Sequence, residues 1–406
     1  MSDSMQAHRI GAAEAADTLV ESREALTDLC NRLSRSPAVA LDTEFHSERR
    51  FWPELFLVQL ADTTGAWLVD PLAVRDLSPL RALISDPAVV KVMHSSRNDI
   101  AILRKYLSCE FTGVFDTQLA AAFLGYGEQC SLYNLLQDVC GIRARKAFCL
   151  SDWSRRPLAP EQIEYALDDV RHLHGLHSKL SEQLARKGRS SWYELEAASL
   201  TEPGAYEVNL PEMYRRARSA GKLKKSGLPV LWALVKWREE RAMEMDRPRA
   251  HIATDSMLAR LATMSPTTAD SLDRLRGLPS GFQARWGAEV LAVVRDALDS
   301  PPSDVPEIPV RRPDGGASAR ADILRIYLKQ KAHQLKIAPS LLLPRDFLEK
   351  LAALPRTAAV DCLRQGCLAG WRMEVLGDEL EALLTGRMAL VMGSGPAGGL
   401  KFIRTR

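Results

Sequence analysis

The segment Val39-Ala-Leu-Asp-Thr-Glu-Phe45 sets two acids directly after a short apolar run. Such a run, followed at once by polar residues, is typical of a buried strand that reaches the edge of a sheet. Side chains two residues apart on a strand project from the same face, so Asp42 and Glu44 are expected to lie side by side. Neighbouring carboxylates repel each other unless a cation lies between them, and Mg²⁺ and Mn²⁺ take oxygen ligands. The alternative is a pair of solvent-exposed acids at a strand end.

Short apolar runs and helical patterns alternate on both sides of this segment. Further strands are predicted at 55–60, 66–69 and 89–93, and helices at 22–33, 77–85 and 97–106. After about residue 115 the pattern is helical almost throughout. Strands with interleaved helices, followed by helices alone, predict an α/β domain with a mixed central sheet over residues 21–203.

The remainder of the chain predicts two all-α domains, at 204–300 and 318–392. Residues 301–317 are rich in Pro, Gly and Ser and are expected to form a linker. The two helical regions have similar length and order, which indicates diverged copies of one module. The ends of the chain are expected to be a flexible N-terminus at 1–20 and a Gly-rich tail at 393–406.

Two later segments add acids to the first pair. In Lys91–Ile100, a strand, a short turn and a helix start would place Asp99 near the sheet edge. Its alternative role is to complement the helix dipole as an N-terminal acid. Farther along the chain, Tyr165 and Asp169 are four residues apart on a predicted helix and therefore share a face. Asp168 points about a quarter turn away and is the weaker candidate for a ligand.

The order of these groups is more specific than any one of them. D-x-E, D and Y-x-x-x-D in one α/β domain resemble the DEDD exonuclease superfamily. In its histidine branch a His would stand five residues before the last Asp, where this chain has Glu164. The tyrosine branch is therefore favoured.

The resemblance to the ribonuclease D family of that branch extends over about residues 20–390. It is carried by the segments 51–60, 115–121 and 151–158. The run Lys236–Ala242, with Pro248 and Asp255, resembles the first HRDC domain of that family, and the third region resembles its second, more degenerate HRDC domain. The resemblance implies a ribonuclease H-like exonuclease domain followed by two HRDC-like helical domains.

The family further implies a 3′→5′ exoribonuclease that holds two divalent ions, Mg²⁺ or Mn²⁺, and releases nucleoside 5′-monophosphates. By this resemblance Asp42 bridges both ions, and Glu44 and Asp169 bind the ion that activates water. Asp99 supports the second ion, and Tyr165 orients the water. RNA, and tRNA precursors in particular, is the expected substrate, with a role in tRNA 3′-end maturation.

Four further residues are candidates for contact with the substrate. Phe45 is expected either to stack on a terminal base or to pack in the sheet core. His94 would touch phosphate or orient Asp99, or be a structural histidine. Arg155 and Arg156 would clamp the RNA backbone, because a guanidinium fork suits phosphate. Their neighbours are expected to form a structural turn: Asp152, Trp153 and Pro157.

Composition restricts the class of protein only broadly. A net charge of +3 over 406 residues permits a nucleic-acid partner without requiring one. The basic run Tyr214–Ser226 is either a solvated charge run or a contact to the RNA backbone. The seven cysteines lack zinc-site spacing, and no stretch resembles a signal peptide or a membrane span. We therefore expect a cytoplasmic protein with no membrane partner, and no protein partner is implied. Because two helical modules that flank the site could build a ring within one chain, we expect a monomer.

Three other functions compete with the exoribonuclease. A DNA 3′→5′ exonuclease of the same superfamily would be favoured by a polymerase or helicase region, and the chain has neither. A catalytically silent RNA-binding module would be favoured by a missing acid, whereas all four acids and the tyrosine are present. A structural protein with ordinary surface acids would show no dependence on metal.

Overall fold

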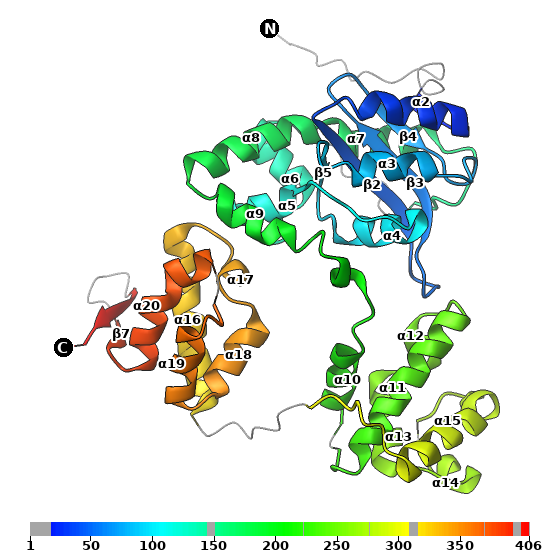
Figure 1. Cartoon of the computed structure of the whole chain (residues 1–406), viewed down its shortest axis with the longest axis vertical. Helices are drawn as coiled ribbons and strands as arrows, with labels where there is room; N and C mark the ends of the chain where they lie inside the picture. Colours follow the sequence, from blue (N-terminus) through cyan, green and yellow to red (C-terminus); the bar gives the residue numbers. More distant parts are fainter. Residues whose placement is uncertain are drawn as a thin grey trace. The chain divides into compact units, whose positions relative to one another are not determined.

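The computed structural model describes residues 18–143, 151–221, 223–275, 277–307, 316–368, 370–392 and 399–405 (Figure 1). The chain divides into two compact units. The first unit comprises Met1–Glu44, Phe56–Ala205 and Arg311–Arg406, and the second comprises Phe45–Leu55 and Tyr206–Val310. In the described part of the chain, no helix is both long and apolar enough to cross a membrane.

The first unit is built on a six-stranded sheet with the order β1-β4-β3-β2-β5-β6. Its strands are β1 (Leu19–Val20), β2 (Ala38–His46), β3 (Glu54–Ala61), β4 (Ala66–Val69), β5 (Val90–Met93) and β6 (Val114–Asp116). Strands β1 and β4, β2 and β5, and β5 and β6 pair in parallel, and β3 and β4 pair antiparallel. The prediction of a mixed sheet is therefore confirmed.

Two strands were missed by the sequence analysis. With two and three residues, β1 and β6 are too short to show the alternation that marks a strand. Residues 1–17 of the predicted flexible N-terminus lie outside the described residues, and Leu19–Val20 pair with β4. The expectation of a flexible segment up to residue 20 is therefore wrong at its end.

Helices lie on both faces of the sheet (Figure 1). Their bounds are α2 (Arg23–Leu33), α3 (Ser78–Ser85), α4 (Arg97–Leu107), α5 (Thr117–Leu124), α6 (Leu132–Leu135), the π-helix η1 (Leu136–Cys140), α7 (Pro160–Arg171), α8 (Leu173–Arg186), α9 (Ser190–Ala198) and the 3₁₀ helix η2 (Pro203–Tyr206). The start of α2 shows how sequence sets a boundary. The Ser22 side chain accepts a hydrogen bond from the Ala25 N–H and satisfies one of the free amides of the first turn.

The second unit is a helical module. It consists of α10 (Leu210–Ser219), α11 (Gly227–Glu244), α12 (Arg249–Ile252), α13 (Asp255–Met264), α14 (Ala269–Asp273) and α15 (Phe282–Asp299). Trp232, Trp237 and Trp286 lie in its core. The segment Phe45–Leu55 belongs to the same unit, where the Arg249 guanidinium lies 4.5 Å from the centre of the Phe51 ring.

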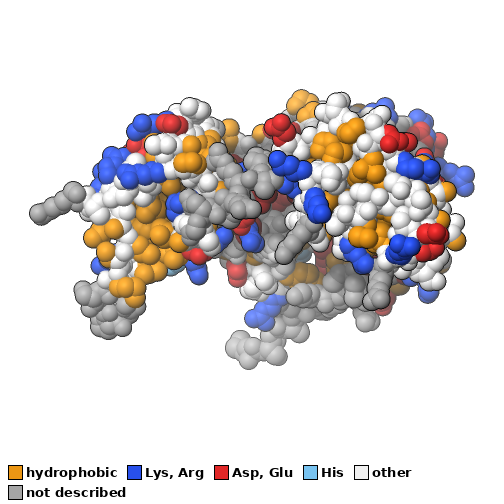
Figure 2. Space-filling model, turned by 90° about the horizontal axis from the view of Figure 1, so that it is seen from below, with side chains coloured by type: hydrophobic (Ala, Val, Ile, Leu, Met, Phe, Trp, Pro, Cys, Tyr) orange, Lys and Arg blue, Asp and Glu red, His pale blue; other side chains and the backbone are white. Residues whose placement is uncertain are grey.

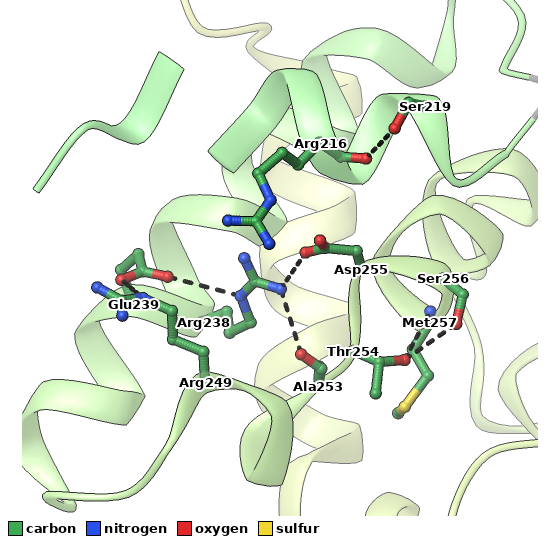
Figure 3. Close-up of polar contacts among 10 residues, drawn as sticks. All are labelled: Arg216, Ser219, Arg238, Glu239, Arg249, Ala253, Thr254, Asp255, Ser256 and Met257. Atoms are coloured by element: carbon green, nitrogen blue, oxygen red, sulfur yellow. Dashed lines mark hydrogen bonds and ion pairs between the residues drawn. The ribbon is translucent and has the colours of Figure 1, made fainter. Parts of the chain in front are cut away.

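Two charged side chains of α11 are buried where this helix meets the starts of α12 and α13 (Figure 3). Arg238 and Glu239 are adjacent on α11 and are 4% and 1% exposed. The Arg238 Nη1 donates to Asp255 Oδ1 at 2.7 Å, and Arg249 Nε donates to Glu239 Oε2 at 2.6 Å. These contacts join α11, α12 and α13, so the charges set how the three helices meet.

The third helical region repeats the order of elements of the second unit. It consists of α16 (Ala317–Leu335), α17 (Pro339–Leu342), α18 (Arg345–Ala353), α19 (Arg356–Arg364) and α20 (Trp371–Leu384). As in α11 to α15, a long helix precedes a four-residue helix that ends at an extended residue, Ala253 in one region and Leu343 in the other. This shared order supports the interpretation of two diverged copies.

The chain after α20 forms a hairpin instead of the expected tail. Strands β7 (Met388–Met392) and β8 (Leu400–Arg404) pair antiparallel, with Tyr327 of α16 against the Phe402 ring. Residues 393–398 lie outside the described residues. The Gly-rich composition concealed a strand that tertiary packing stabilises, because Phe402 has an aromatic partner in α16.

The third region packs against the exonuclease domain within the first unit. The Trp371 and Trp192 rings are stacked with centres 4.8 Å apart. Arg372 Nη2 donates to Glu196 Oε2 at 2.8 Å, and a second hydrogen bond joins Arg372 to the other oxygen of the same carboxylate. The Ala338 N–H donates to the Ala122 carbonyl at 2.9 Å. One apolar core therefore contains residues of both regions. Residues 308–315 of the predicted linker lie outside the described residues.

Candidate active site

Three elements of the first unit place the acids. Asp42 and Glu44 lie on β2, in a strand that the sequence predicted. Asp99 is the third residue of α4, which follows the neighbouring parallel strand β5. Asp169 lies on α7, one turn after Tyr165. The sequence therefore placed each of these residues on the correct type of element.

The four carboxyl groups share one electrostatic environment. Burial raises the pKa of Asp42 well above its usual range, and the neighbouring charges of Asp99, Asp169 and Glu44 raise it further. Like charges held together out of water favour protonation, or a cation between them. Asp42 and Asp169 are 127 positions apart in the chain, yet the charge of Asp169 raises the pKa of Asp42, so both belong to one site.

The other three acids show the same effect. Burial raises the pKa of Glu44 from 4.5 to about 8, with contributions from Asp169 and Asp99. Burial also raises the pKa of Asp99 from 3.8 to about 7 and that of Asp169 from 3.8 to about 7. Ordinary surface acids would not be shifted in this direction, so the alternative of exposed strand-end acids does not describe this site.

Thr43 is a site residue that the sequence analysis missed. It is 6% exposed, and its Oγ1 donates a hydrogen bond to Asp99 Oδ1, which ties β2 to α4. Its backbone N–H donates to Asp42 Oδ1 at 2.9 Å. The sequence carries no clear signal for it, because the two-residue period of a strand directs the Thr43 side chain to the face opposite that of Asp42 and Glu44.

The donor chemistry of the site fits divalent cations. Four carboxylates are hard oxygen ligands, and their raised pKa values show that the site lacks compensating positive charge. Among the described residues, no three His, Cys, Asp or Glu side chains already stand in an arrangement that could hold a metal ion. Asp42 and Asp99 are hydrogen-bonded to Thr43, and Asp169 to Tyr165. Ligation would exchange these partners for a cation.

Tyr165 stands beside Asp169 at the wall of the site. A hydrogen bond from the Tyr165 side chain lowers the pKa of Asp169 against the larger effect of burial. Both residues line a small cavity, together with Asp168 and three residues of α6 and η1: Leu132, Tyr133 and Leu136. The spacing of these three residues does not indicate that α6 lies against α7, so the sequence did not predict them as part of the site.

Asp168 forms an ion pair with an arginine of its own helix. Arg171 Nη1 donates to Asp168 Oδ1 at 2.7 Å and to Glu164 Oε1 at 3.0 Å. All three residues lie on α7, and the shared guanidinium neutralises both acids. This geometry agrees with the weaker candidacy of Asp168 as a ligand.

His94 has a structural environment. Its Nδ1 lies 2.8 Å from Thr117 Oγ1, and its Nε2 lies 3.0 Å from the Cys130 carbonyl oxygen. Burial lowers the pKa of the imidazole. Both ring nitrogens have protein partners, so the structural alternative fits His94 better than contact with phosphate.

The two adjacent arginines have different environments. The five N–H groups of Arg156 donate to Asp70, Trp153, Arg155 and Phe56, which leaves none for RNA. The expectation that Arg156 clamps the RNA backbone is therefore wrong for this geometry. The side chain of Arg155 is 81% exposed and pairs with Asp152 in the same loop, so it remains a candidate.

Phe45 and the basic run remain candidates for contact with RNA. Phe45 is partly buried on β2 directly after Glu44. In the basic run, Arg216, Lys224 and Lys225 are exposed, and Arg215 pairs with Glu212. Figure 2 shows side chains of both charges interspersed on one face. The mixed surface agrees with the small net charge.

Two family models and several known proteins match the chain. A family model described as a 3′-5′ exonuclease matches residues 18–185, and the HRDC domain model matches residues 228–294. The ribonuclease D of Granulibacter bethesdensis is 38% identical over 379 residues, which cover 92% of this chain and 94% of that protein. The chain belongs to the ribonuclease D family.

Other members of the ribonuclease D family agree over the same length. The ribonuclease D of Acidiphilium cryptum is 36% identical over 378 residues, 92% of this chain and 94% of that protein. The crystal structure of Escherichia coli RNase D matches with a TM-score of 0.79 and 27% identity, covering 91% of this chain and 98% of that chain. The chain is therefore a 3′→5′ exoribonuclease of this family, and its α/β exonuclease fold with a helical HRDC region is confirmed.

Proposed function

We propose that this exoribonuclease hydrolyses the 3′-terminal phosphodiester of RNA by a two-metal mechanism and releases nucleoside 5′-monophosphates. The observation that supports this most directly is the cluster of four buried or partly buried acids with raised pKa values, bordered by Tyr165. A site that concentrates negative charge favours divalent cations, and RNA phosphate would approach it only with those cations bound.

Each acid has a distinct proposed task. Asp42 lies at the centre of the electrostatic coupling and would bridge two ions. The charge of Asp169 raises the pKa of Glu44, and these two acids would hold one ion, while Asp99 would hold the other from α4. When bound, the two ions supply charge neutralisation at the phosphate and make water more acidic.

Tyr165 would orient the attacking water. Its side chain is hydrogen-bonded to Asp169, so its hydroxyl already lies beside the acid that would hold the water-side ion. A phenol O–H can both donate and accept a hydrogen bond, which suits a role in orientation. Phe45 and Arg155 would contact the terminal base and the backbone.

We propose that the substrates are structured RNAs with a short 3′ tail. A tRNA precursor is the first substrate to test. The E. coli RNase D structure is described as an exoribonuclease involved in structured RNA processing. The HRDC domain that follows the exonuclease domain in the chain would offer a second surface for a folded RNA. We further expect a monomer in the cytoplasm.

The decisive assay uses a 3′-tailed tRNA precursor and a matched single-stranded DNA, both labelled at the 5′ end. Pure protein is incubated with Mg²⁺, Mn²⁺ or EDTA, and Asp42→Asn and Tyr165→Phe are run in parallel. We expect a ladder that shortens from the RNA 3′ end only, requires metal and disappears with Asp42→Asn. Released products are identified as 5′-monophosphates by chromatography.

Other outcomes would separate the parts of the proposal. Equal trimming of DNA would be compatible with the proposed metal site but would contradict the proposed preference for RNA. Trimming in EDTA would contradict the two-metal mechanism. Trimming of an unstructured RNA at the same rate as the tRNA precursor would remove the preference for folded substrates.

A further inference from the structure

The segment Ser151–Leu158 carries a network that the proposed mechanism does not use. Asp70 follows β4 and is 1% exposed, and both of its carboxylate oxygens accept hydrogen bonds from Arg156, at 2.5 and 2.8 Å. The Arg156 Nη1 then donates to the Trp153 carbonyl at 2.8 Å. A bidentate pair fixes the plane of the guanidinium, so the backbone at Trp153 is fixed relative to the sheet.

The network continues from Trp153 to Tyr165. The Trp153 ring is buried, and its centre lies 6.1 Å from that of the Tyr165 ring at an angle of 37°. Both rings belong to one apolar cluster, which also contains Phe56 and Leu68 of the sheet. Tyr165 is hydrogen-bonded to Asp169. A contiguous set of contacts therefore runs from the end of β4 to the acid cluster.

The indole of Trp153 contributes packing and no hydrogen bond. Among the described residues, Trp153 Nε1 is buried without a hydrogen-bond partner. A buried N–H without a partner is unfavourable for folding, and an apolar ring would avoid that cost. Trp153 therefore contributes to this site through the packing of its large ring against Tyr165.

We infer that Asp70, Arg156 and Trp153 form a brace that positions the Tyr165 hydroxyl for catalysis. The inference rests on the proposed role of Tyr165. The brace fixes the tilt of the phenol ring, so that the hydroxyl stays at Asp169 when RNA and water enter. Trp153 and Arg156 are positioning residues: they act on the reaction only through Tyr165.

A double-mutant cycle tests this directly. In the parent protein, Trp153→Leu is expected to lower kcat by about 10- to 100-fold, the scale expected for a misplaced group, with KM for the RNA within about twofold. In the Tyr165→Phe background the same substitution is expected to change kcat by less than about twofold, because the hydroxyl that it misplaces is absent. Trp153→Phe retains a ring and should recover part of kcat.

The adjacent arginines provide a matched pair. Arg156→Lys keeps the charge but loses the five-donor fork, so it should lower kcat and leave KM unchanged. Arg155→Ala removes an exposed cation and should raise KM with kcat retained. Arg372→Lys is the control for general destabilisation: it breaks a guanidinium–carboxylate pair that does not contact Tyr165. Its effect on kcat should be equal in both backgrounds.

The outcomes distinguish the inference from the proposed function. If Tyr165→Phe lowers kcat and the effect of Trp153→Leu persists undiminished in that background, the brace is only structural and the inference is overturned. If Tyr165→Phe leaves kcat unchanged, the proposed role of Tyr165 fails and the inference fails with it. Thermal unfolding identifies a Trp153→Leu protein that does not fold, in which case Trp153→Phe and Arg156→Lys carry the same cycle.

Discussion

Glu44 shows how strongly one carboxyl group depends on its surroundings. Burial, with Asp169 and Asp99 nearby, raises its pKa from 4.5 to about 8. Between these two values the folded protein holds a proton that the unfolded chain has released. The contribution of the Glu44 proton to the free energy of unfolding is therefore fully present below about pH 4.5. It is lost as the pH rises through about 8.

A first prediction follows for the metal-free protein. Glu44→Gln removes the group that loses its proton, so in EDTA its Tm should exceed that of the parent at pH 8 and equal it near pH 5. Thermal unfolding at both pH values measures this. Equal Tm values at pH 8 would show that the Glu44 carboxylate carries no penalty.

A second prediction concerns metal binding. Ligation requires deprotonated carboxylates, so Mg²⁺ should raise Tm more at pH 8 than at pH 6. Asp42→Asn should abolish most of this difference, because it removes the acid coupled to the other three. A Mg²⁺-induced shift that is the same at both pH values would place the metal elsewhere.

At the scale of elements, α11 is held by charges that its neighbours supply. Arg238 and Glu239 are buried, and each pairs with a partly exposed side chain from another helix, Asp255 of α13 and Arg249 of α12 (Figure 3). Removing one partner of a buried ion pair leaves the other charge without compensation. The packing of these helices should therefore depend on single side chains in the network.

Glu239→Ala should destabilise the second unit by about 1–3 kcal/mol, because Arg249 loses its acceptor and the buried Arg238 keeps only Asp255 as an acidic partner. Hydrogen exchange of the α11 amides in the full chain measures the loss. The control is Glu240→Ala, the next residue and an exposed one, which should change stability by less than about 0.5 kcal/mol. Similar losses for both variants would contradict the role of the network.

At the scale of the whole molecule, the third helical region is part of the folded exonuclease unit. Arg189 donates to the Phe123 carbonyl and to the carbonyls of Leu335 and Lys336, which belong to the third region. Trp192 and Trp371 stack across the same boundary. These contacts give the region a structural task besides any contact with RNA.

Arg372→Ala should therefore lower the free energy of unfolding of the first unit by about 1–3 kcal/mol, as expected for hydrogen bonds to a charged group. Urea unfolding of the full chain provides the measurement. Arg345→Ala is the matched control, since the exposed pair with Glu349 should contribute less than about 1 kcal/mol. An Arg372→Ala protein as stable as the control would mean that the two regions are energetically independent.

Much of the fold and of the acid cluster was predictable from local spacing. The two-residue period of a strand puts Asp42 and Glu44 on one face, and the helical period does the same for Tyr165 and Asp169. The apolar run that indicated β2 covers only Val39–Leu41, whereas the strand spans Ala38–His46, because the acids interrupt the apolar run before the strand ends. The resemblance in motif order supplied the link between the distant acids.

The sequence by itself determined which groups the chain offers and on which elements they stand, because backbone geometry relates residues a few positions apart. Only the tertiary structure decided which partners they meet. Arg155 and Arg156 are chemically identical neighbours, yet Arg156 is bound to Asp70, 86 positions away, and Arg155 is exposed. That difference arises from packing: a folded core brings together residues distant in the chain, and no local period records their meeting.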